Sequence, residues 1–113
     1  MTVDVYSQYF AGECVFNEVP RRAVIVKLTC ESGGGEVYYT VNLSFFPHRD
    51  EEDYAVSYDA YAEKEIFRKS GRRSKKREEA LLADLRTHAD ELAASLNGCI
   101  HWDAPLRDAR RES

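Results

Sequence analysis

Residues 36–46 read EVYYTVNLSFF, and every second residue of this stretch is apolar. The apolar positions are Val37, Tyr39, Val41, Leu43 and Phe45. Successive side chains of a β-strand point to opposite faces, so strict alternation is typical of a strand with one buried face. The stretch therefore predicts a half-buried antiparallel strand, and the rest of the sheet can be built outward from it.

Further strand patterns precede this stretch. Residues 22–30 (RAVIVKLTC) also place apolar side chains at alternate positions, and a glycine cluster at 33–35 separates them from the strand at 36–46. Two strand patterns around glycines predict a β-hairpin. Residues 3–10 and 13–19 are rich in β-branched and aromatic types. They predict two more strands, joined by a turn at 11–12.

The segment 54–67 follows a polar loop at 47–53 and fits two patterns. Val56, Tyr58 and Ala60 alternate as in a strand, and we adopt a long strand, with a bulge, as the interpretation of 54–67. The sequence DAYAEKEIF, which starts at Asp59, also suits a helix. A helix over 59–67 therefore stays open as the alternative.

A helical pattern covers residues 75–96, where apolar residues recur three and four positions apart. They are Leu81, Leu82, Leu85, Ala89, Leu92, Ala93 and Leu96. Ser74 can cap the first turn, and Asn97-Gly98 is a natural stop. We expect one long helix over about 74–97, followed by a short final strand at 99–102.

These elements predict an α+β fold. Its mainly antiparallel sheet has five to six strands, and the long helix (about 74–97) packs on one face. A chain of 113 residues has room for one core, so we expect a single domain over 1–103 and a polar, frayed tail over 104–113. The composition, 43% hydrophobic and 32% charged, is that of an ordinary globular protein.

The compartment is predicted from the cysteines and from two missing signals. Three cysteines are an odd number for a disulfide framework, which favours reduced thiols. No apolar run is long enough to cross a bilayer, and the first residues lack the pattern of a signal peptide. We therefore expect a cytoplasmic protein with no membrane partner.

Basic residues are concentrated in one segment of an otherwise acidic chain. Residues 68–77 read RKSGRRSKKR, which includes seven of the 16 Lys and Arg and none of the 20 Asp and Glu. Cations at the start of a helix oppose the helix dipole, and together with free amides they favour an anion such as a phosphate backbone. The candidate anion-binding residues are Arg68, Lys69, Arg72, Arg73, Lys75, Lys76 and Arg77.

A solvated segment is the alternative for these cations. They would then pair with carboxylates of the acidic body, for which the nearest candidates along the chain are Glu63, Glu65, Glu78 and Glu79. Surface ion pairs of this kind are common and contribute little. The two interpretations differ in whether the cations have partners within the chain.

The face of the sheet opposite the helix provides a second candidate site. One helix covers only part of five or six strands, and Tyr38, Phe46 and Ile25 fall off the main core face. Exposed apolar patches usually mark interaction sites. We therefore expect a non-catalytic module that binds a protein partner, or itself as a homodimer, through an uncovered sheet face or edge. Binding of nucleic acid or another polyanion through 68–77 is the alternative.

Signatures of catalysis and metal binding are absent from the sequence. The cysteines and histidines show no CxxC or HxxxH spacing, and Cys99-x-His101 is at most a weak pair of ligands. The glycines at 33–35 open a strand rather than a helix, which favours a turn over a phosphate loop. We expect no enzyme activity, no metal site and no cofactor.

Overall fold

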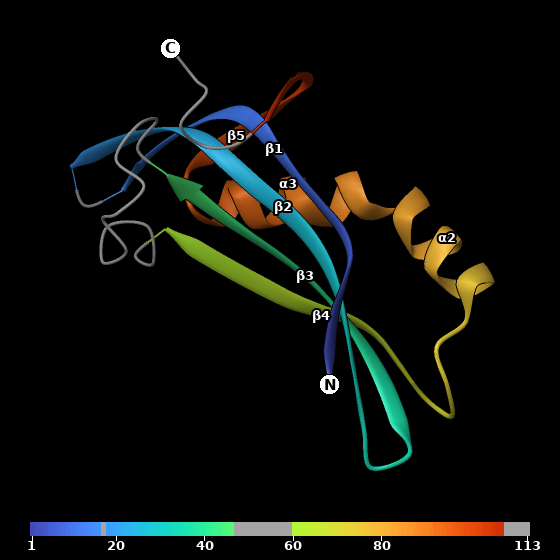
Figure 1. Cartoon of the computed structure of the whole chain (residues 1–113). Helices are drawn as coiled ribbons and strands as arrows, with labels where there is room; N and C mark the ends of the chain where they lie inside the picture. The colour runs from blue at the N-terminus through green and yellow to red at the C-terminus, as the bar shows by residue number, and fades with distance from the viewer. Residues whose placement is uncertain (17, 47–59, 108–113) are drawn as a thin grey trace.

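The computed structural model describes residues 1–16, 18–46 and 60–107. Its elements are β1 (Thr2–Phe16), β2 (Val19–Gly33), β3 (Glu36–Phe46), β4 (Tyr61–Ser70), α2 (Lys75–Ala83), α3 (Leu85–Ser95) and β5 (Gly98–Leu106). The strands form one antiparallel sheet in the order β4-β3-β2-β1-β5. Figure 1 shows α3 crossing one face of this sheet. The fold is α+β, with a five-stranded antiparallel sheet as predicted.

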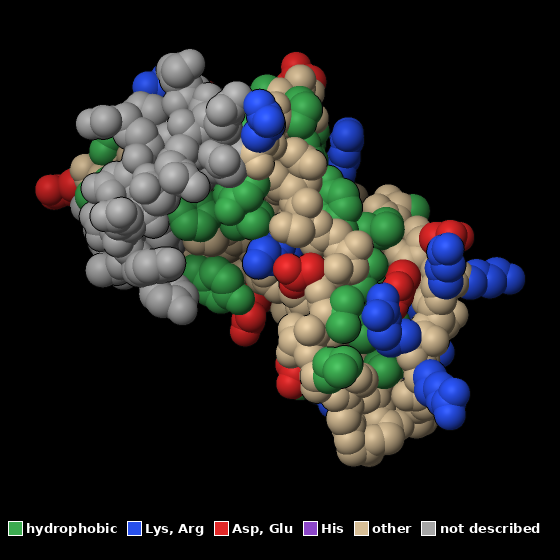
Figure 2. Space-filling view, in the orientation of Figure 1, with side chains coloured by type: hydrophobic (Ala, Val, Ile, Leu, Met, Phe, Trp, Pro, Cys, Tyr) green, Lys and Arg blue, Asp and Glu red, His purple; other side chains and the backbone are tan. Residues whose placement is uncertain are grey.

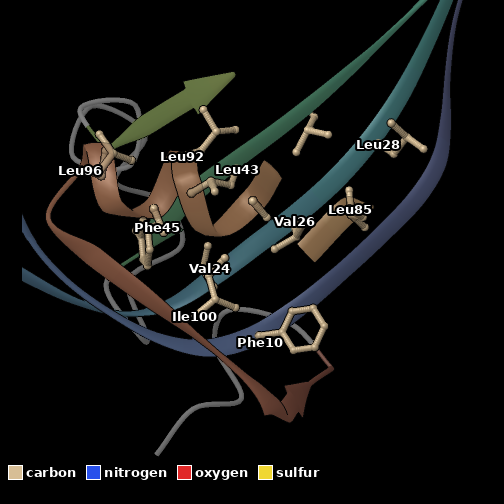
Figure 3. Close-up of a cluster of buried hydrophobic side chains, with 14 of the residues drawn as sticks. Phe10, Val24, Val26, Leu28, Leu43, Phe45, Leu85, Leu92, Leu96 and Ile100 are labelled. Atoms are coloured by element: carbon tan, nitrogen blue, oxygen red, sulfur yellow. The ribbon is translucent and has the colours of Figure 1, made fainter. Parts of the chain in front are cut away.

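The core lies between α3 and the sheet face that it covers (Figure 3). The five alternating apolar residues of β3 are each at most 1% exposed, which confirms the predicted strand and its buried face. Their counterparts on β2 include Val24, Val26 and Leu28, all fully buried. From the helix side, Leu85, Ala89 and other residues at helical spacing complete the cluster.

The predicted hairpin between β2 and β3 is confirmed. Gly33 pairs with Glu36, and both intervening glycines have positive φ, 63° at Gly34 and 81° at Gly35. Two central residues with positive φ give the turn whose twist matches the twist of the flanking strands. Glycine adopts this conformation without the steric cost that a side chain would bring.

The turn predicted at 11–12 is wrong, because β1 is one continuous strand. It contains a register irregularity between Ala11 and Cys14, and the chain reverses only after Phe16, which pairs with Val19. Gly12 serves a different purpose. A Cβ there would lie 2.9 Å from the Cys99 carbonyl oxygen and 3.2 Å from the Phe45 ring, so glycine permits close packing rather than a turn.

The single long helix is also wrong, because the chain forms two shorter helices that meet at Asp84. This residue has φ −102° and ψ 5°, and its N–H donates to the carbonyls of Leu81 and Leu82. The Asp84 side chain makes no capping hydrogen bond, so the break reflects the position of the sheet: α3 packs across it, whereas α2 extends away from it. The predicted ends are better matched: Ser74 Oγ accepts from the backbone N–H of Arg77, and Asn97 has φ 59°.

The remaining strands differ from expectation in their bounds. β4 confirms a strand rather than a helix from Tyr61 onward, and it extends past Phe67 to Ser70. The expected bulge lies where Tyr39 pairs with Phe67 but Thr40 pairs with Glu65. Residues 54–59 lie outside the described part. β5 extends to Leu106, beyond residue 103, and residues 108–113 of the predicted tail lie outside the described part.

Candidate functional site

Arg68, at the end of β4, belongs to a network of ion pairs on the sheet. Its guanidinium donates to both oxygens of Glu65, at 3.2 and 2.7 Å, and to Glu36 at 3.1 Å. It also lies over the ring of Tyr38, 4.4 Å from the centroid. The hydrogen bonds from Arg68 lower the pKa of the Glu65 carboxyl. Arg68 therefore already has partners within the chain, as the alternative interpretation expected.

Arg73 is engaged too, in what we call the Glu78 cluster (Tyr39, Arg73 and Glu78). Its Nε donates to Glu78 Oε2 at 2.8 Å and its Nη2 to Oε1 at 3.1 Å. The Tyr39 hydroxyl donates to the same Oε2 at 2.9 Å. Glu78 is 8% exposed, yet the hydrogen bonds from Arg73 lower the pKa of its carboxyl. These bonds offset the cost of burying the charge.

The other five cations of 68–77 form what we call the basic cluster. Its members are Lys69, Arg72, Lys75, Lys76 and Arg77. Within the described part of the chain, the structure records no ion pair for any of the five. Arg77 instead lies over the ring of Phe67, 4.3 Å from the centroid. The predicted segment thus divides into two engaged arginines and five cations for which no described residue provides a carboxylate partner.

A surface hollow of about 230 Å³ lies within the basic cluster. It is lined by Lys69 from β4 and by Ser74, Lys76, Arg77 and Ala80 from the start of α2. The chain turns at Gly71, between β4 and α2, and this turn brings Lys69 close to the cations of α2. A hydroxyl and three cations around one hollow suit an anionic group.

The two predicted residues of the helix-free sheet face do not form one patch. Tyr38 lies beneath Arg68, whereas Phe46 lies further along β3 beside Tyr9, with ring centroids 6.3 Å apart. Polar residues at 40, 42 and 44 separate them along that face of the strand. Figure 2 shows acidic and basic side chains interspersed among the hydrophobic ones on this side. The described residues therefore do not form a broad apolar docking face.

Glu13 of β1 and His101 of β5 form a polar pair that no sequence pattern indicated. Glu13 lies opposite Cys99 in the β1–β5 register, and its carboxylate is 3.0 Å from Nε2 of His101. Hollows of about 380 and 420 Å³ flank Glu13, one toward His101 and one toward Cys99. The register of two distant strands creates this group, so no local motif signals it. Among the described residues, no group of three or more His, Cys, Asp or Glu could hold a metal ion.

The two edges of the sheet differ in charge. β4 forms one edge and carries Glu63, Lys64, Glu65, Arg68 and Lys69. On the other side, β5 pairs only with residues 9–14 of β1, so among the described strands none pairs with this side of 2–8. Charged side chains protect an edge against pairing with another chain. The first half of β1 is thus the less protected edge.

No family model matches the chain, and neither a curated protein nor a solved structure matches it. In the described part, no helix combines the length and apolar character needed to span a membrane. The function is therefore argued from the basic cluster and the open edge.

Proposed function

We propose that this protein is a non-catalytic binding module whose basic cluster takes a polyanion. One observation carries the proposal: Lys69, Lys76 and Arg77 line one hollow at the start of α2. None of the five cations of the basic cluster has a carboxylate partner among the described residues. The acidic residues Glu65 and Glu78, which do lie nearby, are already paired with Arg68 and Arg73. The remaining positive charge is therefore available to a ligand.

The contacts around the cluster favour recognition of phosphate or sulfate groups over recognition of bases. The rings of Tyr38 and Phe67, which lie beside the segment, already carry the guanidinium groups of Arg68 and Arg77. Base stacking needs a free aromatic face. The ligand class is therefore a phosphate or sulfate backbone, such as that of a nucleic acid, which is bound with little dependence on sequence.

The acidic body of the chain limits how such a ligand is bound. The net charge of −4 repels a polyanion everywhere except near the basic cluster. Contacts are confined to a few phosphate or sulfate groups, so affinity is modest and falls steeply with salt. Each such contact contributes about 0.7–0.9 to the slope of log K against log salt concentration.

Replacing Lys75 and Lys76 together by Glu should abolish salt-dependent retention on heparin and weaken binding to a labelled single-stranded DNA. Because two contacts are lost, the slope of log K against log salt concentration should become less steep by about 1.5. Acidic residues in the first turn of a helix are favourable, so the double variant should fold. Fluorescence anisotropy at several salt concentrations measures the slope, and circular dichroism checks the fold.

The matched control is the double variant Lys64→Glu with Arg107→Glu, which changes the net charge equally but away from the basic cluster. Arg73 is left intact in both, because reversing its charge would disrupt the Glu78 cluster. The control should keep most of the retention. If both double variants lose retention on heparin equally, only the net charge matters. If Lys75→Glu/Lys76→Glu keeps its full retention, the proposal is wrong.

A second candidate function is self-association through the open edge of β1. Val3, Val5 and Tyr6 are partly buried along this edge. Its one charged residue, Asp4, has its carboxylate 3.7 Å from the Lys27 ammonium on the neighbouring strand. An edge with little charge favours pairing with the same edge of a second copy.

Ser7→Glu should weaken such self-association about tenfold or more, because two like charges would meet across the paired edges. Ser7 is exposed and lies opposite Lys27, which can accommodate the new carboxylate in the monomer. Sedimentation velocity over a range of concentrations measures the change. Ser70→Glu on the β4 edge is the control. A wild-type protein that stays monomeric at the highest concentration would exclude this candidate.

We also propose that the protein is cytosolic. Cys14, Cys30 and Cys99 are free cysteines, and free thiols are usual in a reducing compartment.

A further inference from the structure

Helix α2 is joined to the rest of the molecule by few contacts. It buries only two of its residues, Glu78 and Leu81, whereas α3 buries Leu85, Ala89, Leu92 and Ala93. In Figure 1, α3 crosses the sheet while α2 extends away from it. Glu78 accepts a hydrogen bond from Tyr39 on β3, and Arg77 lies over the ring of Phe67 on β4. Leu81 belongs to the hydrophobic core, and Leu82 packs against it. The attachment of α2 thus depends on the Glu78 carboxylate and on a few apolar contacts.

Both ends of α2 are places where the backbone can turn. Gly71, which precedes it, has φ 104°, a conformation that L side chains rarely adopt. Its N–H donates to Gly35 O at 2.9 Å, the last recorded backbone bond to the sheet before the helix. Asp84, which follows α2, is not helical. Small changes of φ and ψ at two such residues are enough to move a rigid helix.

A thiol lies at the base of the Glu78 cluster. Cys30 on β2 is 1% exposed and pairs with Tyr39 in the β2–β3 register. Burial, the bond to Glu78 and the contact with the Cys30 thiol together raise the pKa of Tyr39. Cys14, by contrast, is buried at the far end of α3, where its Sγ lies 3.3 Å from the Leu96 carbonyl oxygen. The reactivity of Cys30 can therefore report on α2, and that of Cys14 on α3.

We propose that α2 opens as a unit about Gly71 and Asp84, that the Glu78 cluster holds it closed, and that opening exposes Cys30 while the core beneath α3 stays intact. The two residues at its ends provide the hinges. The bond from the Tyr39 hydroxyl to Glu78 provides the closing contact, because Arg73 follows Gly71 and moves with α2 while its own bonds keep Glu78 charged. Opening would also move Lys75, Lys76 and Arg77, which α2 carries. The inference holds whether or not the basic cluster binds a polyanion.

Alkylation of the three cysteines by N-ethylmaleimide, followed by mass spectrometry, tests this proposal on the full chain. Cys99 is exposed and should react at once. Cys30 should react faster than Cys14, at a rate that hardly changes with low concentrations of urea, because local opening exposes little surface. The rate at Cys14 should rise steeply with urea, as expected when only global unfolding exposes a thiol.

Two variants separate local opening from global unfolding. Glu78→Gln replaces the charged acceptor of the Tyr39 bond by a neutral amide and should raise the Cys30 rate about fivefold. Glu79→Gln, the exposed neighbour on the same helix, is the matched control and should change neither rate. Leu92→Ala weakens α3 and should raise the rate at Cys14 while leaving that at Cys30 unchanged, because the open state keeps α3 packed.

The proposal is overturned if Cys30 and Cys14 depend equally on urea, or if Leu92→Ala raises both rates by the same factor. Either result would mean that α2 separates only when the whole domain unfolds. If Glu78→Gln leaves the Cys30 rate unchanged, Glu78 does not hold the helix. If Glu78→Gln fails to fold, Tyr39→Phe removes the bond that joins α2 to β3 and should raise the Cys30 rate at least as much.

Discussion

Phe45→Ala should lower the free energy of unfolding by about 3–5 kcal/mol, the range for removing a buried aromatic side chain. Phe45 is fully buried on β3, among the side chains that Figure 3 labels. Its ring lies within 3.2 Å of where a Cβ on Gly12 or Gly98 would be, so β1, β3 and β5 all meet at this ring. Alanine would leave a cavity where three strands and α3 come together.

The neighbouring residue provides the control. Phe46 lies on the opposite face of β3 and is only half-buried, beside Tyr9. Phe46→Ala should cost about 1 kcal/mol, because less apolar surface is uncovered. Urea unfolding followed by circular dichroism measures both values. Equal losses at residues 45 and 46 would contradict the sidedness of the sheet described here.

Gly98→Ala should lower the free energy of unfolding by about 1–3 kcal/mol, a large effect for one methyl group. A Cβ on Gly98 would lie 2.7 Å from the Glu13 carbonyl oxygen, 3.0 Å from the Phe45 ring and 3.1 Å from Cys14 Cβ. The nearest of these atoms is backbone in a paired strand, so it cannot move without disturbing the β1–β5 pairing. The strain arises from packing, since Gly98 does not have positive φ.

Gly33→Ala is the matched control for this prediction. Gly33 also lies in a strand without positive φ, and no atom lies within 4 Å of the position of an added Cβ. Alanine there should be neutral or stabilising by about 0.4–1 kcal/mol, because it reduces the conformational freedom of the unfolded chain. A loss at residue 33 as large as that at residue 98 would exclude the close approach as the cause.

The strands at 36–46 and 22–30 could be predicted because alternation is a local property. Each apolar side chain at every second position must lie on one face, whatever the strand pairs with. The hairpin between them was equally local, since Gly34 and Gly35 provide the positive φ of its turn. The same local reasoning placed the start of α2 at Ser74.

The errors arose where a residue has its conformation or role for a tertiary reason. Gly12 resembles a turn residue in sequence, but it is present because β5 and Phe45 pack against its Cα. The leucine pattern of 75–96 continues across Asp84, yet only the part beyond it packs along the sheet. Periodicity shows which residues share a face of a helix, but it does not show where the underlying sheet ends.

The candidate site also contains contacts that could not be predicted from the sequence. The sequence identified the basic segment 68–77, but it could not say which cations are engaged. Glu78 is buried against Tyr39 of β3, and Arg73, five residues before it, pairs with the carboxylate there. Arg68 finds Glu36 because β3 and β4 are neighbours. The open half of the β1 edge was equally hidden, since it depends on where β5 stops pairing.

Local chemistry was therefore sufficient for the α+β class, the buried face of each central strand and the position of the basic segment, because these follow from the order of side chains along the chain. The break at Asp84, the burial of Glu78 against Tyr39 and the exposed edge were decided by contacts between residues far apart in sequence. Such contacts depend on strand register and on the extent of the sheet, which no single segment encodes.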